Sequence, residues 1–374
     1  MNDLVTKKVS LIELFYDLVF VYMISQATGL IHHLHNGVIG LSTFSIFALV
    51  VILFINSWMI QTVFINRYGN DSWSNKLFIF INMAVVLYMS NSFSSTFNHQ
   101  LTPFFGAAAL LSLTQTMQYV IVYLKTIQNA DKQITLAFSG ILATRTLALT
   151  IGAAVQNQLG LLAALLGIMI SWIAPSFTGK LTVRRPIIFS HLLERVTALI
   201  IIMFGEMIVG IAEYFTQRTV SPYSLLLFVL VALLFMTYAT EFSDLIEEKQ
   251  GRETGNRLIY LHYFILFGLS LITVAIKFIH STNANLIFSV GCLYMGLLLF
   301  YVGILLGGIY NEVSFKIGSR RVCWIIGFTL LGWGGTLQLK NATEIIFITV
   351  VVALLNLLIL ARIGQNGTSR QKIQ

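Results

Sequence analysis

Ionisable side chains lie inside apolar stretches of this sequence, where they must either do chemistry or pair with one another. The segment SLIELFYDLVF, residues 10–20, places Glu13 and Asp17 four residues apart. Residues at this spacing share one face of a helix, so the two carboxylates are neighbours. A charge in hydrocarbon costs roughly 2.5–3.5 kcal/mol on insertion scales, which makes such groups functional candidates. Buried carboxylates and histidines are suited to binding and releasing protons.

The same criterion selects residues in four further apolar stretches. His191 and Glu194 lie three residues apart with Arg195 beside them, and Glu241 and His262 are predicted near the same membrane surface. The candidate substrate- or proton-binding residues are Glu13, Asp17, Arg145, His191, Glu194, Arg195, Glu206, Glu241 and His262.

Two of these candidates are predicted to lie deep in the membrane. Arg145 is about 12 residues into its span and Glu206 about 14 residues into its own, or roughly 18 Å and 21 Å at 1.5 Å per residue. Both depths are just past the middle of a hydrocarbon core about 30 Å thick. We expect Arg145 to pair with Glu206, and Asp17 is the competing partner.

The same residues have other interpretations. Glu13, Asp17, His191 and Glu194 are also possible ligands of a divalent ion, since carboxylates and imidazoles bind metals. This is the weaker alternative, and no metal or cofactor is expected. Glu194 and Arg195 could instead reach the interface and anchor a helix end. Glu13 could neutralise the positive first turn of its helix.

The composition is that of a membrane protein. The 374 residues are 57% hydrophobic and 10% charged, whereas soluble domains have about 25% charged residues. Apolar stretches of 18 or more residues recur, each long enough to cross a bilayer as a helix. We predict an all-α polytopic membrane protein with twelve transmembrane helices. Their expected ranges are 11–31, 43–64, 77–95, 103–124, 133–154, 158–177, 191–213, 221–245, 258–279, 284–309, 321–339 and 342–362.

The basic residues predict how the chain is oriented. Of 23 Lys and Arg residues, 18 fall on the side of the N-terminus, three on the opposite side and two within spans. Because cytoplasmic loops carry the excess of positive charge, both termini are expected in the cytoplasm. The net charge of +8 then serves orientation and contact with anionic lipids, and no nucleic-acid partner is expected.

An internal repeat is also predicted. LLERVTALIIIMFGEMIVGI, from residue 192, aligns with LIELFYDLVFVYMISQATGL, from residue 11, and matches Glu13 to Glu194 but Asp17 to Ala198. The same offset carries the second, third and fourth spans onto the eighth, ninth and tenth. Two parallel six-helix halves follow. The expected parts are an N-terminal half at 1–177, a cytoplasmic linker at 178–190, a C-terminal half at 191–363 and a cytoplasmic tail at 364–374.

Three segments resemble the bacterial low temperature requirement protein A family. LIELFYDLVFVYMISQAT (11–28) is similar to the family's L-E-L-F-F-D-L-V-F-V signature, with Tyr16 where the family often has Phe. HLLERVTALIIIMFGEMIVGI (191–211) resembles its H-x-x-E-R…G-E segment, and YLHYFILFGL (260–269) its Y-L-H segment. The resemblance implies a bacterial plasma-membrane protein needed for growth in the cold, and implies no particular activity. It carries over to Glu13, Asp17, His191, Glu194, Arg195, Glu206 and His262.

Three classes of function fit these features. The favoured one is a transporter or channel for a small solute or ion, coupled to protons, because twelve spans in a 6+6 repeat and deep acids suit it. The alternatives are an intramembrane enzyme acting on a lipid or isoprenoid, and a non-catalytic lipid-binding or scaffold protein for cold adaptation. Enzymatic activity is the less expected outcome. The expected partners are membrane lipids and the small solute or ion, and the oligomeric state is not predicted.

Overall fold

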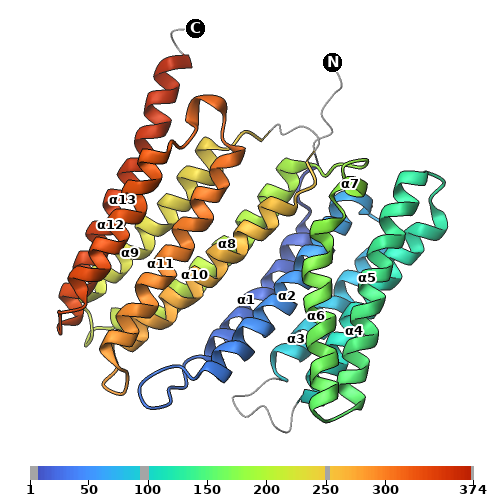
Figure 1. Cartoon of the computed structure of the whole chain (residues 1–374), viewed down its shortest axis with the longest axis horizontal. Coiled ribbons are helices and arrows are strands. Elements are labelled where there is room, and N and C mark those ends of the chain that lie inside the picture. The colour runs from blue at the N-terminus through green and yellow to red at the C-terminus, as the bar shows by residue number, and fades with distance from the viewer. Residues whose placement is uncertain (1–6, 93–100, 249–252, 372–374) are drawn as a thin grey trace. The chain divides into compact units, whose positions relative to one another are not determined.

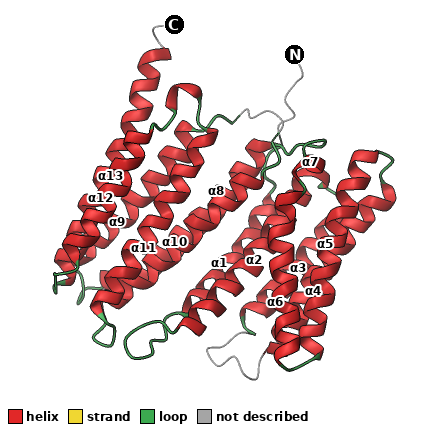
Figure 2. Cartoon of the chain, in the orientation of Figure 1, coloured by secondary structure: helices red, strands yellow, loops and turns green. Residues whose placement is uncertain are grey.

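The computed structural model describes residues 7–92, 101–248 and 253–371, and the described chain folds into helices without a strand (Figures 1 and 2). The α-helices are α1 (Leu11–Leu30), α2 (Leu41–Tyr68), α3 (Trp73–Ser90), α4 (Leu101–Lys125), α5 (Asn129–Ala154), α6 (Gln158–Phe177), α7 (Gly179–Thr182), α8 (Phe189–Ile211), α9 (Pro222–Ala239), α10 (Asn256–His280), α11 (Leu286–Gly307), α12 (Ser319–Thr336) and α13 (Ala342–Gln371). Shorter turns are the 3-10 turns η1 (Ala212–Phe215), η3 (Gly308–Tyr310) and η4 (Val313–Phe315) and the π-helix η2 (Thr240–Leu245).

Each of the twelve predicted spans contains a helix. Within the described residues, ten helices are long and apolar enough to cross a membrane. The two long helices outside this group are α3 and α12, each of 18 residues and each with basic and other polar residues in its first turns. The sequence-based prediction of a multi-pass helical membrane protein is therefore confirmed, and ten of the twelve predicted spans are candidates by length and composition.

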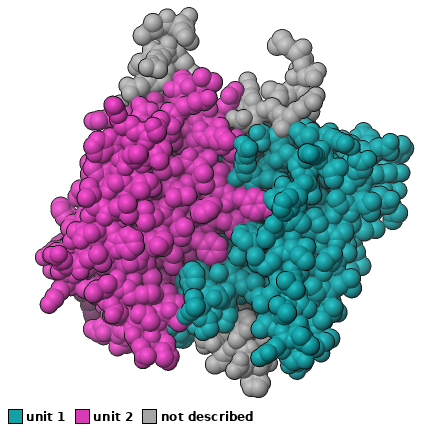
Figure 3. All heavy atoms as spheres, viewed as in Figure 1, with its two compact units in different colours: residues 1–33, 41–198, 251–257 teal, residues 34–40, 199–250, 258–374 magenta. Residues whose placement is uncertain are grey.

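The chain divides into two compact units, coloured separately in Figure 3. Unit 1 comprises residues 1–33, 41–198 and 251–257, so it holds α1 to α7 and the first part of α8. Unit 2 comprises residues 34–40, 199–250 and 258–374, and it holds the rest of α8 and the helices that follow, except the first two residues of α10.

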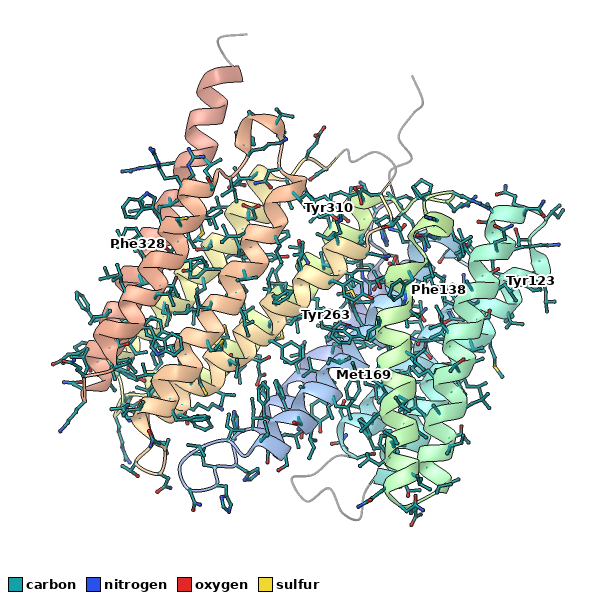
Figure 4. All side chains as sticks on the ribbon, viewed as in Figure 1. Tyr123, Phe138, Met169, Tyr263, Tyr310 and Phe328 are labelled. Carbon is teal, nitrogen blue, oxygen red and sulfur yellow. The ribbon has the colours of Figure 1, made fainter. Side chains whose placement is uncertain are left out.

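Small residues and stacked rings hold helices of unit 1 together. A Cβ atom on Gly152 of α5 would lie 2.7 Å from the Ala164 side chain of α6, and one on Gly167 would lie 2.4 Å from Ala148. Glycine at these positions lets the two backbones approach closely. On the other side of α5, the ring of Phe138, labelled in Figure 4, stacks on a tyrosine of α4 with ring centroids 5.3 Å apart.

Helix α2 is well buried although it has no charged residue in its apolar interior. Of its most apolar 18 residues 61% are buried, against 39% for α5. The reason is that α2 carries uncharged polar side chains, including Asn56, Gln61 and Thr62, that also need partners away from hydrocarbon.

In unit 2, α10 is the most buried of the candidate spans, because 78% of its most apolar 18-residue stretch is buried. It packs on α11 where Gly268 faces Gly296, because a Cβ atom on Gly268 would lie 2.7 Å from the Gly296 carbonyl oxygen. The π-helix η2 continues α9, and the residue after it, Ile246, forms an isolated antiparallel bridge with Asn311 just beyond α11.

Candidate functional site

The first turns of α1 present two buried carboxylates. Glu13 and Asp17, one helical turn apart, are each 2% exposed. Glu13 also completes the start of the helix, because its Oε1 atom accepts hydrogen bonds from the Ser10 backbone N–H at 3.1 Å and the Ser10 hydroxyl at 2.8 Å. This is a capping box, and it leaves the second carboxylate oxygen of Glu13 free to face another helix.

The first turns of α8 supply the opposing bases. His191 and Arg195 lie four residues apart and are fully buried. Arg195 joins both acids, with Nη1 2.9 Å from Glu13 Oε2 and Nη2 2.7 Å from Asp17 Oδ1. One guanidinium therefore bridges two carboxylates through separate nitrogens, a fork geometry for which arginine is suited.

Helix α2 completes the site with polar side chains at every fourth position. The Trp58 indole N–H donates to Asp17 Oδ1 at 2.6 Å, and the Trp58 ring lies under the Arg195 guanidinium at 5.3 Å. The Thr62 hydroxyl lies 3.4 Å from Arg195 Nη2. These contacts place Asp17 between two donors and put the Arg195 cation against an aromatic face.

Asn66 determines the state of His191. Its amide oxygen accepts from the Ile188 backbone N–H at 2.9 Å, and its NH2 group donates to the Ile188 carbonyl at 2.9 Å. That pairing fixes which end of the amide is the donor, and the NH2 group lies 3.1 Å from His191 Nδ1. Nδ1 then accepts from this amide, which places a ring proton on Nε2. Nε2 lies 3.1 Å from Glu13 Oε2.

The charges of this cluster do not balance. Two carboxylates face one guanidinium, so the acids of the cluster outnumber its permanently charged bases by one. Asp17 Oδ2 is buried without a hydrogen-bond partner among the described residues. One proton on a carboxylate would neutralise the cluster, and Asp17 Oδ2 is the oxygen left available for it.

A pocket of about 220 Å³ reaches this cluster from the start of α1. Glu13 and Ser10 line it together with residues from the end of α2 and the start of α3. Lys7, also in its wall, donates to the carbonyl oxygens of Ile65, in the last turn of α2, and Gly69, just after that helix. Burial lowers the pKa of Lys7, and the nearby Glu13 carboxylate opposes that effect. The pocket thus connects the exterior of unit 1 to Glu13.

Glu194 does not join the cluster. Its side chain is exposed, although it lies next to Arg195 in the chain, because adjacent helix residues point in different directions. Within the described ranges, no three His, Cys, Asp or Glu side chains gather as a metal site would require. The divalent-ion alternative that combined Glu13, Asp17, His191 and Glu194 is therefore not supported.

Arg145 lies in a second polar network of unit 1 and is fully buried. Its Nε donates to the Ser112 hydroxyl at 2.9 Å and its Nη2 to Gln115 Oε1 at 2.7 Å. Asp17, the competing partner proposed from the sequence, pairs with Arg195 instead. The pairing of Arg145 with Glu206 stays a prediction, because the two residues belong to different units.

The remaining predicted residues lie in unit 2. Glu206 on α8 is 9% exposed, and both Glu241 on η2 and His262 on α10 are fully buried. His262 Nδ1 lies 2.6 Å from the Leu258 carbonyl and its Nε2 3.2 Å from the Tyr238 hydroxyl. These contacts engage both nitrogens of the His262 ring.

Sequence reasoning missed the contribution of α2, namely Trp58, Thr62 and Asn66. None of the three was among the candidate residues. The available signal was the spacing of the three residues, since positions i, i+4 and i+8 of a helix share a face. A polar stripe at that spacing in an otherwise apolar span indicates a buried polar partner, even without a charge.

Fold and site together define a multi-pass α-helical membrane protein with a buried cluster of acids and bases. The family model of the bacterial low temperature requirement A protein matches residues 8–357. The chain therefore belongs to this family, which confirms the resemblance seen in the sequence. Comparison with curated proteins and with solved structures finds no match.

Proposed function

We propose that the protein is a transporter or channel that moves a small solute or ion across the bacterial plasma membrane, coupled to protonation of the Glu13–Asp17–Arg195 cluster. The observation that carries the proposal is the excess acid in this buried cluster. A purely structural ion pair needs one acid for one base. Two acids around one arginine leave a site whose net charge depends on one proton.

The pocket beside Glu13 supports access to the cluster. It is lined by Glu13, whose Oε2 contacts both Arg195 and His191. A proton arriving from the pocket meets Glu13 first, and Arg195 links Glu13 to Asp17 behind it. When one acid is protonated, its attraction to Arg195 weakens, so the guanidinium shifts toward the other acid. Such an exchange of partners is the local event that we assign to coupling.

The proposed protein has twelve spans and both termini in the cytoplasm, as expected from the sequence. Helices α3 and α12 then lie in the membrane in addition to the ten candidate spans. Under this topology the pocket beside Glu13 opens to the cytoplasm.

We also propose that the twelve helices form two parallel six-helix halves. The repeat matches α2, α4, α5 and α6 to α9, α11, α12 and α13 by order. In unit 1, α5 packs against α4 and α6, and α2 packs against α6. In unit 2 the corresponding pairs, α12 with α11 and α13, and α9 with α13, are also in contact. This agreement of neighbours supports a duplicated plan.

The experiment is flux in proteoliposomes with an imposed pH gradient. Wild-type protein should acidify the liposome interior or take up a solute in proportion to the gradient. Asp17→Asn, which cannot gain or lose the proton, should reduce that flux to the level of empty liposomes. Asp244→Asn is the matched control, because Asp244 is exposed on η2, and it should behave as wild type. Gradient-driven flux that survives Asp17→Asn would refute proton coupling at this cluster.

A further inference from the structure

A second site is indicated around Glu241, in unit 2. Glu241 lies on the π-helix η2 and is fully buried, with 0% of its surface accessible to solvent. π turns are rare, and they occur mostly as single turns at functional positions. The wider turn moves Glu241 out of the register that α9 would otherwise give it.

The Glu241 carboxylate lies against the end of α11. A Cβ atom on Gly307 would be 3.5 Å from its Oε1 atom, and one on Gly308 would be 3.7 Å from it. Helix α11 ends at Gly307 and continues as the turn η3, whose last residue, Tyr310, is labelled in Figure 4. The C-terminal end of a helix carries partial negative charge and unpaired carbonyl groups. A carboxylate at this end therefore adds negative charge to negative charge.

The Asn311 side chain approaches the Glu241 carboxylate, and among the described residues no cation compensates for its charge. In the part of the chain that the structure describes, neither oxygen of Glu241 has a hydrogen-bond partner, and no Lys, Arg or His side chain forms a salt bridge with it. The Asn311 side-chain oxygen is likewise buried without a donor. The Asn311 amide nitrogen lies 3.5 Å from the Phe315 carbonyl instead. Oxygen acceptors without donors are the chemistry of a cation site.

The surrounding backbone holds this site in place. Ile246, after the π-helix, pairs with Asn311 in the antiparallel bridge. The Glu247 N–H donates to the Tyr310 carbonyl at 3.0 Å, and the Glu312 N–H donates to the Leu245 carbonyl at 3.1 Å. These two hydrogen bonds join the end of η2 to the segment after α11. The backbone near both Glu241 and Asn311 is therefore held in place.

We infer that Glu241, with Asn311 and the carbonyl-rich end of α11, binds a monovalent alkali cation, Na⁺ or K⁺. One positive charge neutralises one buried carboxylate, whereas a divalent ion would leave an excess charge in the apolar interior. Carboxylate and amide oxygens are the ligands that hard cations prefer. The inference concerns binding alone, so it stands or falls separately from proton-coupled flux at Asp17.

The test is thermal unfolding of the purified full chain at constant ionic strength, with NaCl or KCl replacing choline chloride. A bound cation stabilises the folded state, so Tm should rise with alkali concentration and then saturate. Glu241→Gln should abolish the rise. Asn311→Ala should raise the apparent Kd about tenfold, the usual loss when a supporting ligand is removed. Asp244→Asn, an exposed acid on the same π turn, should keep the wild-type response.

A direct measurement covers the case in which Glu241→Gln fails to fold. Wild-type protein should bind radioactive sodium or rubidium at one site per chain, and choline should not compete. If Tm follows pH but not alkali concentration, and no cation binds, Glu241 is a buried protonated acid and the inference is overturned.

Discussion

Arg195 is the residue on which the Glu13 cluster depends. Its two terminal nitrogens contact different carboxylates, and its planar face covers Trp58. Lysine has one ammonium group on a flexible stem and would not reproduce this geometry. A change at Arg195 therefore affects Glu13 and Asp17 together.

Replacing Arg195 with Gln should destabilise the protein by about 3–5 kcal/mol, because two buried acids lose their shared cation. The loss should appear as a lower Tm in detergent. Adding Glu13→Gln and Asp17→Asn to this variant removes the uncompensated charges, and most of the Tm should return. An equal Tm for the single and triple variants would show that Arg195 acts through packing on Trp58.

The sequence could predict which residues are buried at a cost, but not which of them meet. Glu13, Asp17, His191 and Arg195 were all found from charge in apolar stretches. Distance along a helix gives the depth of a side chain, whereas partners depend on how each helix is rotated. The sequence therefore grouped Glu194 with His191, three residues before it. In the structure it is Arg195, four residues after His191, that faces the cluster, and Glu194 is exposed.

At the scale of elements, hydropathy located the helices well because length and apolar character determine a span. It did not reveal η2, which lies inside the predicted span 221–245. Nor did it reveal α7, a single turn within the predicted linker 178–190. A π turn adds one residue without changing composition, so no hydropathy pattern marks it.

The contact between α10 and α11 gives a prediction for these helices. Gly268→Ala and Gly296→Ala should each lower stability by about 1–3 kcal/mol, because the new methyl group would lie 2.7–2.8 Å from backbone oxygen of the facing helix. Thermal unfolding measures the change. Gly291→Ala on α11 is the control, since nothing lies within 4 Å of its Cβ position. Three variants of equal stability would contradict the close packing.

At the scale of the whole molecule, the proposed topology requires α3 and α12 to cross the membrane. Positions 70 and 92 lie on either side of α3, and positions 319 and 340 lie at the first residue of α12 and beyond its end. If both helices span, an impermeant maleimide should label Ser92→Cys and Lys340→Cys in intact cells. Asn70→Cys and Ser319→Cys should react only after permeabilisation, since they lie on the predicted cytoplasmic side.

The background for this experiment lacks the native cysteines, Cys292 and Cys323, of which Cys323 is exposed. Equal labelling of the two positions that flank one helix would show that this helix does not span. The basic residues fall mostly on one side of the membrane when twelve helices span. If one of these helices did not span, every loop between it and the nearer terminus would move to the opposite side.

Asn66 has a consequence for motion within unit 1. Its amide pairs with both backbone groups of Ile188, as a neighbouring strand would, and the same amide touches His191. These hydrogen bonds join the end of α2 to the start of α8, and Arg195 ties α1 to both. Under the proposed coupling, a change of protonation at Asp17 should therefore displace these three helix ends together.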